Sequence, residues 1–227
     1  MKVVLFGASG MIGYGVLRAC LDDDAVQSVT AVVRRPLGLR HPKLHEVVHA
    51  DFTDLTDVAA SLDGADACYF CLGTPSAGLT EAEYTRVTHD YALAAAHALL
   101  PLNDELTFVY VSGNSADSAS RTMWARVKGR TEDALLALPF HAYVFRPTYI
   151  RPRQGARPGT RSYRLMYAAT SWLYPVLRRL FPQHMTTTDT LGRAMLGVTR
   201  LRGSGPRVLT STGINHLGAR PLPEVTS

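Results

Sequence analysis

Three glycines at the start of the chain constrain its fold more than any other feature. Gly7, Gly10 and Gly13 follow an apolar, β-branched run, residues 2–6, and open a segment with an apolar helical face, residues 10–21. A glycine turn between a buried strand and a helix lets the backbone approach a pyrophosphate, and the helix N-terminus offers free N–H groups and a partial positive charge. In this setting the motif predicts a dinucleotide-binding loop, although its spacing is GxxGxxG and not GxGxxG.

Strand and helix patterns alternate along the rest of the chain. We expect strands at residues 2–6, 28–33, 46–49, 66–72, 106–111, 142–145 and 207–209, and helices at residues 10–21, 54–62, 81–100, 122–138 and 191–198. Strands separated by helices imply right-handed crossovers and a parallel sheet that is covered on both faces. The predicted fold is therefore α/β, a Rossmann-type doubly wound and mostly parallel sheet.

The length of 227 residues and the 46% of hydrophobic residues suit a single α/β domain with a sizeable core. We expect this domain to span residues 1–217 and the tail, residues 218–227, to be loose. The pattern changes after Arg146-Pro147, so residues 147–190 are predicted to form a small C-terminal, substrate-side subdomain at the carboxyl edge of the sheet.

The charge and the hydropathy of the chain indicate which classes of partner to expect. The formal net charge is +5, but the only lysines are Lys2, Lys43 and Lys128, and no basic helix carries interleaved aromatics, so we expect no nucleic acid. We also expect no membrane span, because no apolar run reaches roughly 18–20 residues. For the arginine cluster over residues 146–164, a solvated loop and a lid for an anionic substrate are equally favoured predictions.

The three cysteines fit a reducing compartment, and a cytoplasmic location is the simplest prediction. Cys68 and Cys71 have CxxC spacing, but they lie in an apolar run that reads as a buried strand, where residues three apart point to opposite faces. We therefore expect them to pack in the core. No HxxH, HxxxH or carboxylate pair marks a metal site, and none is predicted.

The end of the second strand indicates which dinucleotide is bound. An acidic residue near this position usually holds the ribose hydroxyls of NAD, whereas this chain has Arg34 and Arg35 there. A guanidinium pairs well with a phosphate, so we expect NADP(H) to be preferred over NAD(H). After the third strand, Asp51 and Phe52 are candidates for contacts to the adenine amine and ring, and Asp51 could equally cap the next helix.

Several motifs occur together in an order that resembles the atypical short-chain dehydrogenases/reductases, and most closely their Tat-interacting-protein-like branch. The shared segments are Gly7 to Gly13, Arg34-Arg35, Cys71-Leu72-Gly73-Thr74, Val111-Ser112-Gly113, Val127-Lys128-Gly129 and Phe145-Arg146-Pro147. The resemblance covers about residues 2–200. It implies that the dinucleotide is held by Gly7, Ser9, Gly10, Met11, Ile12, Gly13, Arg34, Arg35, Asp51, Phe52, Leu72, Gly73, Thr74, Ser112, Lys128 and Pro147.

The resemblance also implies a catalytic set of Ser, Tyr and Lys, with Tyr four residues before Lys. Ser112 and Lys128 stand at two of these places, but Trp124 occupies the tyrosine position. An indole N–H only donates and cannot serve as a general acid or base. The cofactor site is therefore expected, whereas the usual catalytic step is in question.

Three functions stay open at this point. Another tyrosine could supply the proton, with Tyr149 the best candidate and Tyr84, Tyr91 and Tyr110 behind it. The protein could instead bind NADPH without turnover, as a sensor or scaffold that acts through a homodimer or a protein partner. Trp124 could also stack on the substrate or nicotinamide of an enzyme with other chemistry. A sugar-nucleotide epimerase is a further alternative, although the C-terminal region is short for one.

Overall fold

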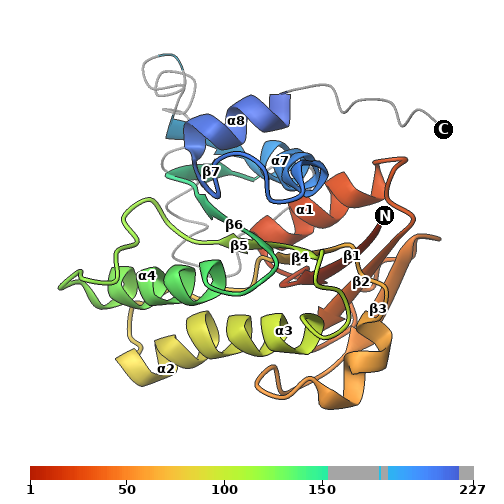
Figure 1. Ribbon diagram of the computed structural model, residues 1–227, viewed down its shortest axis with the longest axis horizontal. Coiled ribbons are helices and arrows are strands. Elements are labelled where there is room, and N and C mark those ends of the chain that lie inside the picture. The colour runs from red at the N-terminus through yellow and green to blue at the C-terminus, as the bar shows by residue number, and fades with distance from the viewer. Residues whose placement is uncertain (153–178, 180–183, 220–227) are drawn as a thin grey trace.

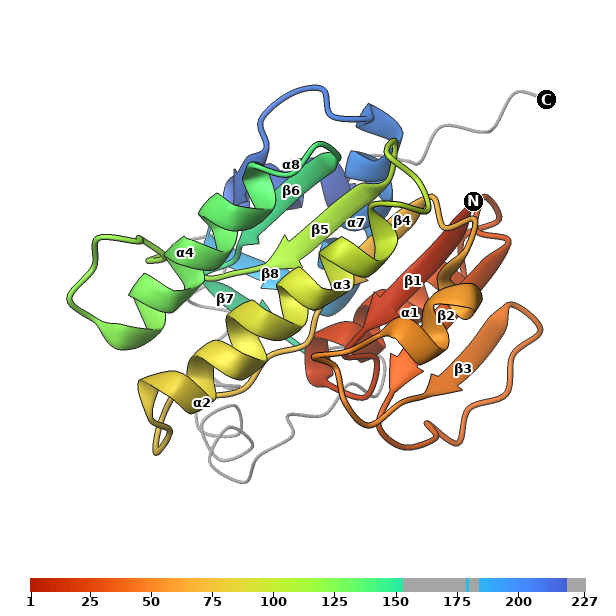
Figure 2. The same ribbon diagram turned by 60° about the horizontal axis from the view of Figure 1, so that its bottom comes forward.

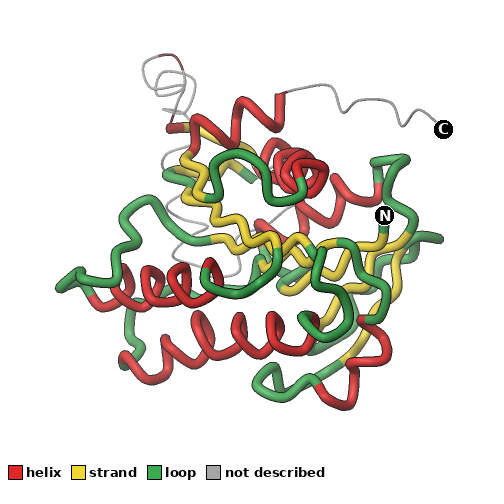
Figure 3. The backbone as a smooth tube through the Cα atoms, in the orientation of Figure 1, coloured by secondary structure: helices red, strands yellow, loops and turns green. Residues whose placement is uncertain are grey.

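The computed structural model describes residues 1–152, 179 and 184–219, and it shows one central sheet between two layers of helices (Figures 1 and 3). The sheet contains β1 (Lys2–Phe6), β2 (Ser28–Val33), β3 (Leu44–Val48), β4 (Ala67–Phe70), β5 (Thr107–Val111), β6 (His141–Arg146) and β9 (Val208–Thr210). Their order is β3-β2-β1-β4-β5-β6-β9, and every neighbouring pair is parallel. The predicted Rossmann-type sheet is confirmed.

Helices cover both faces of this sheet (Figure 1). One layer contains α1 (Met11–Leu21), α7 (Thr188–Leu201) and α8 (Ser211–Ala219). The other contains the 3₁₀ helix η1 (Thr56–Leu62), α2 (Glu81–Thr85), the π-helical turn η2 (Arg86–Asp90), α3 (Tyr91–Leu99) and α4 (Met123–Leu136). Each layer needs its own apolar face on the sheet, which explains why the central strands β4 and β5 are buried along their whole length.

The alternation along β1 shows how the two cores divide. Val3 and Leu5 belong to the core under α1 and α7, whereas Val4 and Phe6 belong to the core under α3 and α4. Successive strand residues point to opposite faces, so a five-residue apolar strand contributes to both. The parallel pairing of β1 with β2 and β4 sets its direction and therefore the edge at which the glycine turn leaves the sheet.

Several predicted boundaries change. The third strand begins at Leu44, because its pairing to β2 extends as far as Val29, and the helix expected at residues 54–62 is a 3₁₀ helix from Thr56. The helix expected at residues 81–100 contains a π-helical turn, η2. Helix α7 is longer than predicted and begins at Thr188, where the Thr187 hydroxyl caps it by accepting from the Thr190 amide at 3.1 Å.

Helix α8 is missing from the sequence prediction. Its two glycines weaken the helical pattern, but Gly218 makes the helix pack, since a Cβ there would lie 2.2 Å from the Thr190 carbonyl oxygen of α7. The helix continues to Ala219, two residues into the predicted tail that begins at 218. Residues 220–227 lie outside the described part of the chain.

Only the two ends of the predicted subdomain are described. Strands β7 (Tyr149–Arg151) and β8 (Met185–Thr187) pair in parallel as a second, two-stranded sheet. The arginine-rich cluster from residue 153 onward lies outside the described residues, so its predicted role as a loop or lid is not addressed. Within the described ranges, no helix combines the length and apolar character needed to cross a membrane.

Candidate dinucleotide site

The predicted site residues gather at one edge of the sheet. Because all strands are parallel, the segments that follow β1, β2, β4, β5 and β6 leave the sheet at the same side, toward which the arrowheads point in Figure 2. These segments carry the glycine loop, Arg34-Arg35, residues 72–74, Ser112 and Pro147. Ligands bind at the carboxyl edge in folds of this kind.

The three loop glycines have three different reasons to be glycine. Gly7 has φ +82°, and a Cβ there would lie 2.6 Å from the Leu72 amide nitrogen after β4. A Cβ on Gly13 would lie 2.1 Å from the Gly7 carbonyl oxygen, so Gly13 lets α1 approach the turn. Gly10 differs, because its φ of −80° suits any residue, and among the described residues a Cβ there would meet only the Gly7 carbonyl oxygen, in a tight contact of 3.3 Å.

Gly10 is therefore not required by the turn, contrary to part of the reasoning from sequence. It is the N-cap of α1 and supplies no side-chain cap to the first amides of the helix. Ser9 and Gly10 are exposed, whereas Met11 and Ile12 are half-buried and pack on the core. Among the described residues, the first amides of α1 therefore receive no side-chain cap from Gly10, as at a helix start that binds an anion.

The segment after β4 flanks this loop. Leu72 packs partly on the core beneath α3, while Gly73 is exposed and a Cβ there would meet no atom of the described residues within 4 Å. Thr74 is half-buried. This open stretch lies beside Gly7, since the Leu72 amide is the nearest atom to a Cβ built on that glycine.

Arg34 and Arg35 lie at the end of β2 with both side chains exposed. Within the described residues neither guanidinium has a hydrogen bond or an ion pair. The two guanidinium groups therefore lie at the carboxyl edge of the sheet, the edge from which the glycine loop also leaves, and the described residues give them no ion-pair partner.

The two predicted adenine contacts behave differently. Phe52 is only 3% exposed, and its ring packs edge-on against Phe6 at 6.0 Å and Tyr91 at 5.6 Å between centroids. Its ring is thus part of the core and cannot stack on adenine, which corrects that expectation. Asp51 is exposed, and its Oδ1 accepts from the Thr53 amide at 2.9 Å and hydroxyl at 2.6 Å, bonds that lower the pKa of this carboxyl.

A buried polar cluster lies where β5 and β6 meet α4. The Ser112 hydroxyl donates to the Glu132 carboxylate, and the Arg146 guanidinium pairs with the same carboxylate, with Nε 3.0 Å from Oε2 and 3.1 Å from Oε1. Glu132 is 1% exposed, so its charge is balanced inside the protein. Sequence reasoning missed Glu132, although its place one helical turn after Lys128 was a usable signal.

Lys128 lies beside this cluster on α4. Its Nζ is 3.5 Å from the Val111 carbonyl oxygen and 5.6 Å from the centroid of the Tyr110 ring. Burial lowers the pKa of Lys128 to about 8, and the negative charge of Glu132 opposes that shift. A lysine with such a pKa changes charge in the range of pH at which enzymes commonly work.

The residue that faces Lys128 and Trp124 is Gly113. A Cβ on Gly113 would lie 3.8 Å from both the Lys128 Cδ and the Trp124 Cζ3, which is ordinary contact. The half-buried Trp124 therefore borders the same small space as Lys128, one helical turn earlier. In contrast, the Ser112 proton is engaged by Glu132.

The candidate tyrosines occupy different environments. Tyr110 and Tyr84 are buried in the core, and burial raises the pKa of Tyr110 above its ordinary value. Tyr91 is half-buried against Phe52. Tyr149 is half-buried on β7, two residues after the buried Pro147, at the carboxyl edge of the main sheet. Of the four, Tyr149 has the placement that best suits contact with a ligand at that edge.

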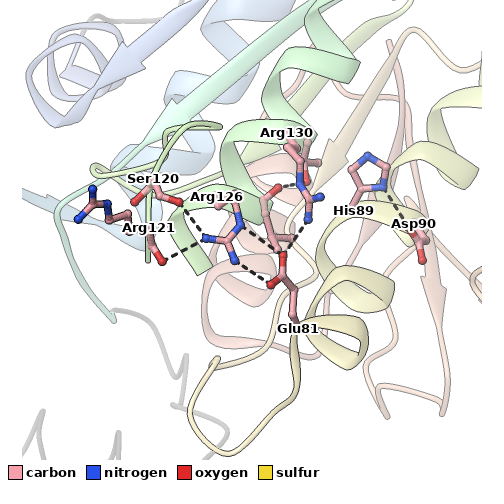
Figure 4. A network of polar contacts seen from close by, with 9 residues as sticks. Glu81, His89, Asp90, Ser120, Arg121, Arg126 and Arg130 are labelled. Carbon is pink, nitrogen blue, oxygen red and sulfur yellow. Dashed lines mark hydrogen bonds and ion pairs between the residues drawn. The ribbon is translucent and has the colours of Figure 1, made fainter. Parts of the chain in front are cut away.

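The outer side of α4 is fixed by a separate network (Figure 4). Glu81 at the start of α2 pairs with Arg126 at 2.7 Å and Arg130 at 3.2 Å, and Arg126 also donates to the Ser120 carbonyl oxygen at 2.9 Å. On its inner side, Gly129 lets the loop after β5 cross α4, since a Cβ there would lie 2.1 Å from the Ser118 nitrogen. These contacts hold the helix that carries Trp124, Lys128 and Glu132.

The cysteines form no site. Cys20, Cys68 and Cys71 are free thiols, and burial raises the pKa of each, which makes them poor nucleophiles. In the portion of the chain that is described, no group of three or more His, Cys, Asp or Glu side chains is arranged to hold a metal.

Comparison with known proteins identifies the family to which this chain belongs. Residues 7–127 match the NAD(P)H-binding family. Protein HTATIP2 of Rattus norvegicus is 30% identical over 96% of this chain and 89% of its own length, and mitochondrial protein fmp52 of Emericella nidulans is 27% identical over 90% and 91%.

Solved structures share the fold. A short-chain dehydrogenase/reductase family oxidoreductase from Burkholderia thailandensis has a TM-score of 0.70 at 17% identity, covering 95% of this chain and 92% of its own. MoeE5, solved with UDP-glucose and NAD, has a TM-score of 0.68 at 18% identity, covering 92% of this chain and 75% of its own. The chain therefore belongs to the NAD(P)H-binding family, in the Tat-interacting-protein-like branch of the atypical short-chain dehydrogenases/reductases.

Proposed function

We propose that this protein binds NADP(H), in preference to NAD(H), at the carboxyl edge of its sheet. The observation that carries dinucleotide binding is the environment of Gly10, and the preference for NADP(H) is supported by the exposed Arg34 and Arg35 at the end of β2. Neither its backbone conformation nor a neighbouring side chain of the described residues requires glycine, and Gly10 is the N-cap residue that directly precedes the first amides of α1. A bound pyrophosphate is the group that a side chain at this position would obstruct.

The remaining contacts are assigned by chemistry and position. The amides of Met11 and Ile12 would hold the pyrophosphate, and the segment from Leu72 to Thr74 would border it. Arg34 and Arg35 would pair with the 2′-phosphate, and Lys128 would bond the nicotinamide ribose, with Ser112 and Pro147 at the same edge. When bound, the dinucleotide supplies a hydride donor or acceptor.

We further propose that Trp124 stands in place of the usual tyrosine, so that catalysis is altered. For an oxidoreductase or epimerase-like enzyme, Tyr149 is our candidate proton donor, with Ser112 and Lys128 as its partners. The second candidate function is NADPH binding without turnover, by a sensor or scaffold. It is favoured by the non-titrating indole of Trp124 and by the engagement of the Ser112 proton with Glu132.

Isothermal titration calorimetry with NADPH and NADH tests the cofactor proposal. We expect NADPH to bind at least about ten-fold more tightly, because one charge-assisted bond is worth roughly 1.5–3 kcal/mol. Arg34→Ala and Arg35→Ala should narrow that difference, while Arg40→Ala, a matched exposed arginine later in the same loop, should not. Equal affinities for the two cofactors would remove the claim of NADP preference.

Turnover is tested by NADPH oxidation across a panel of carbonyl compounds. Reduction that is lost in Tyr149→Phe and kept in Trp124→Phe would assign the proton donor to Tyr149. Tight NADPH binding with no oxidation of any carbonyl would favour the sensor or scaffold. The cytoplasmic location also stays a proposal, to be checked by cell fractionation, since the fmp52 relatives carry "mitochondrial" in their names.

A further inference from the structure

Glu132 is the one buried acid among the described residues of the α4 site, and none of the proposed contacts to the cofactor uses it. We propose that Glu132 is a positioning residue for Lys128: held by Ser112 and Arg146, its carboxylate keeps the Lys128 amine charged where the cofactor is expected. The effect on the cofactor rests on the proposed function, whereas the effect on the lysine does not.

The geometry leaves Lys128 with little other support for a positive charge. Its ammonium has a single hydrogen-bond acceptor within the described residues, the Val111 carbonyl oxygen at the long distance of 3.5 Å, and the Tyr110 ring face at 5.6 Å. Glu132 lies one turn further along α4, so the two side chains leave the same face of the helix, with no direct ion pair between these two described residues. A nearby carboxylate favours the charged form of an amine.

The positive charge of Arg146 partly offsets the effect of Glu132 on Lys128. Its guanidinium pairs with Glu132 from β6 and offsets part of the negative charge that Lys128 would otherwise meet. Tyr110 faces Lys128 from β5 as a neutral ring, and Asp117 and Asp133 act on Arg146 from further away. Burial lowers the pKa of Lys128 to about 8, and Glu132 opposes that shift. The state of the lysine near neutral pH thus depends on Glu132 and Arg146 together.

The chain allows a direct measurement, because it has only three lysines, Lys2, Lys43 and Lys128. Protein labelled with ¹³C at the lysine Cε gives three NMR signals, and Lys128→Met assigns the one of interest. Their midpoints are followed against pH without any cofactor. In Glu132→Gln, which keeps the shape of the side chain, we expect the Lys128 midpoint to fall by about one pH unit.

Loss of the Glu132 charge and loosening of the site predict opposite shifts of the Lys128 midpoint. The direction of the shift therefore separates a positioning role from a structural one. If Glu132→Gln only loosens the site, water enters and the Lys128 midpoint rises toward its ordinary value of about 10.4. Arg146→Gln should raise the midpoint, and by more than Ser112→Ala, which breaks the same cluster without changing a formal charge. An unchanged or higher midpoint in Glu132→Gln would overturn the proposal.

Should Glu132→Gln fail to fold, the comparison of Arg146→Gln with Ser112→Ala tests the proposal instead. Equal rises of the Lys128 midpoint in these two variants would also overturn the proposal. Calorimetry on the same proteins separates this inference from the cofactor proposal. A shifted lysine midpoint in a protein that binds no NADPH would refute the proposed function alone. Unchanged midpoints in a protein that binds NADPH tightly would refute the role of Glu132 alone.

Discussion

The two halves of the candidate site are built in opposite ways. Around the loop from β1 to α1, the important feature is the glycines, and within the described residues Gly10 provides no side-chain cap to the amides of α1. Around α4, the important feature is a buried set of charges, in which Ser112 and Arg146 converge on Glu132 beside Lys128. The first half depends on neighbours in sequence, whereas the second requires residues from β5, β6 and α4 to meet.

This contrast shows which half tolerates change. The glycine loop is shared widely and fixes only how a dinucleotide is held, which leaves the chemistry to the other half. At the α4 half, Trp124 and Gly113 border the space next to Lys128 and provide no group that titrates. A protein with this loop can therefore retain its cofactor while its chemistry is changed or lost.

The largest effect is expected from restoring a phenol in the α4 half. Trp124→Tyr should create or raise NADPH-dependent carbonyl reduction by about 10²–10⁴-fold, because a positioned general acid contributes that much. Gly113 faces position 124, and the Ser112 proton is engaged by Glu132. The double variant Gly113→Ser/Trp124→Tyr places a further hydroxyl beside the new phenol, so its rate of carbonyl reduction should exceed that of the single variant. The measurement is NADPH oxidation across a carbonyl panel, with Trp124→Phe as the control. Inactivity of both tyrosine variants, with NADPH bound normally, would mean that the substrate space is lost.

The next effect separates two glycines within the loop half. Gly10→Val should weaken NADPH binding by about 100-fold, which corresponds to about 2.7 kcal/mol, and leave stability nearly unchanged. Gly13→Ala should instead destabilise the fold by about 3 kcal/mol, because its Cβ would lie 2.1 Å from the Gly7 oxygen. Urea unfolding and calorimetry on both variants test this pair. A Gly10→Val protein with full affinity would show that the loop is only structural.

A smaller effect links the two halves through Lys128. Lys128→Met should weaken NADPH binding about ten-fold, because the loss is of one ammonium donor and not of bulk. In the native protein the amine is mostly charged below its pKa of about 8 and mostly neutral above it, so affinity should be nearly constant below pH 7 and decline progressively from pH 7 to pH 9. Calorimetry over this range should show no such decline in Lys128→Met. A decline of equal size in that variant would assign it to another group.

The smallest effect is expected outside both halves. Glu81→Gln removes the exposed ion pairs with Arg126 and Arg130 and should cost about 0.5 kcal/mol or less, since solvent and salt screen such pairs. Urea unfolding at low and high salt measures this difference, which should vanish at high salt. A large loss of stability would mean that the α2–α4 contact supports the buried cluster more than its exposure indicates.

The sequence by itself determined the layout of the fold and the loop half of the site. Alternating apolar strands and helices specify a parallel sheet. Gly7, Gly10 and Gly13 lie within seven residues of one another, directly after a strand pattern and at the start of a helix pattern. The placement of Arg34 and Arg35 at the end of β2 also followed from position along the chain, because they come directly after a recognisable strand, whereas their contact to a 2′-phosphate stays a prediction. These features depend on short-range patterns, which can be read from neighbouring residues alone.

Only the tertiary structure decided what each polar residue faces. Phe52 lies next to a plausible ligand residue in sequence, yet its ring packs in the core against Phe6 and Tyr91. Glu132 looks like a helical surface acid until Arg146, 14 residues later, and Ser112, 20 residues earlier, are brought to it. Side-chain direction and charge burial depend on packing between distant segments, and no local periodicity records which charges will meet.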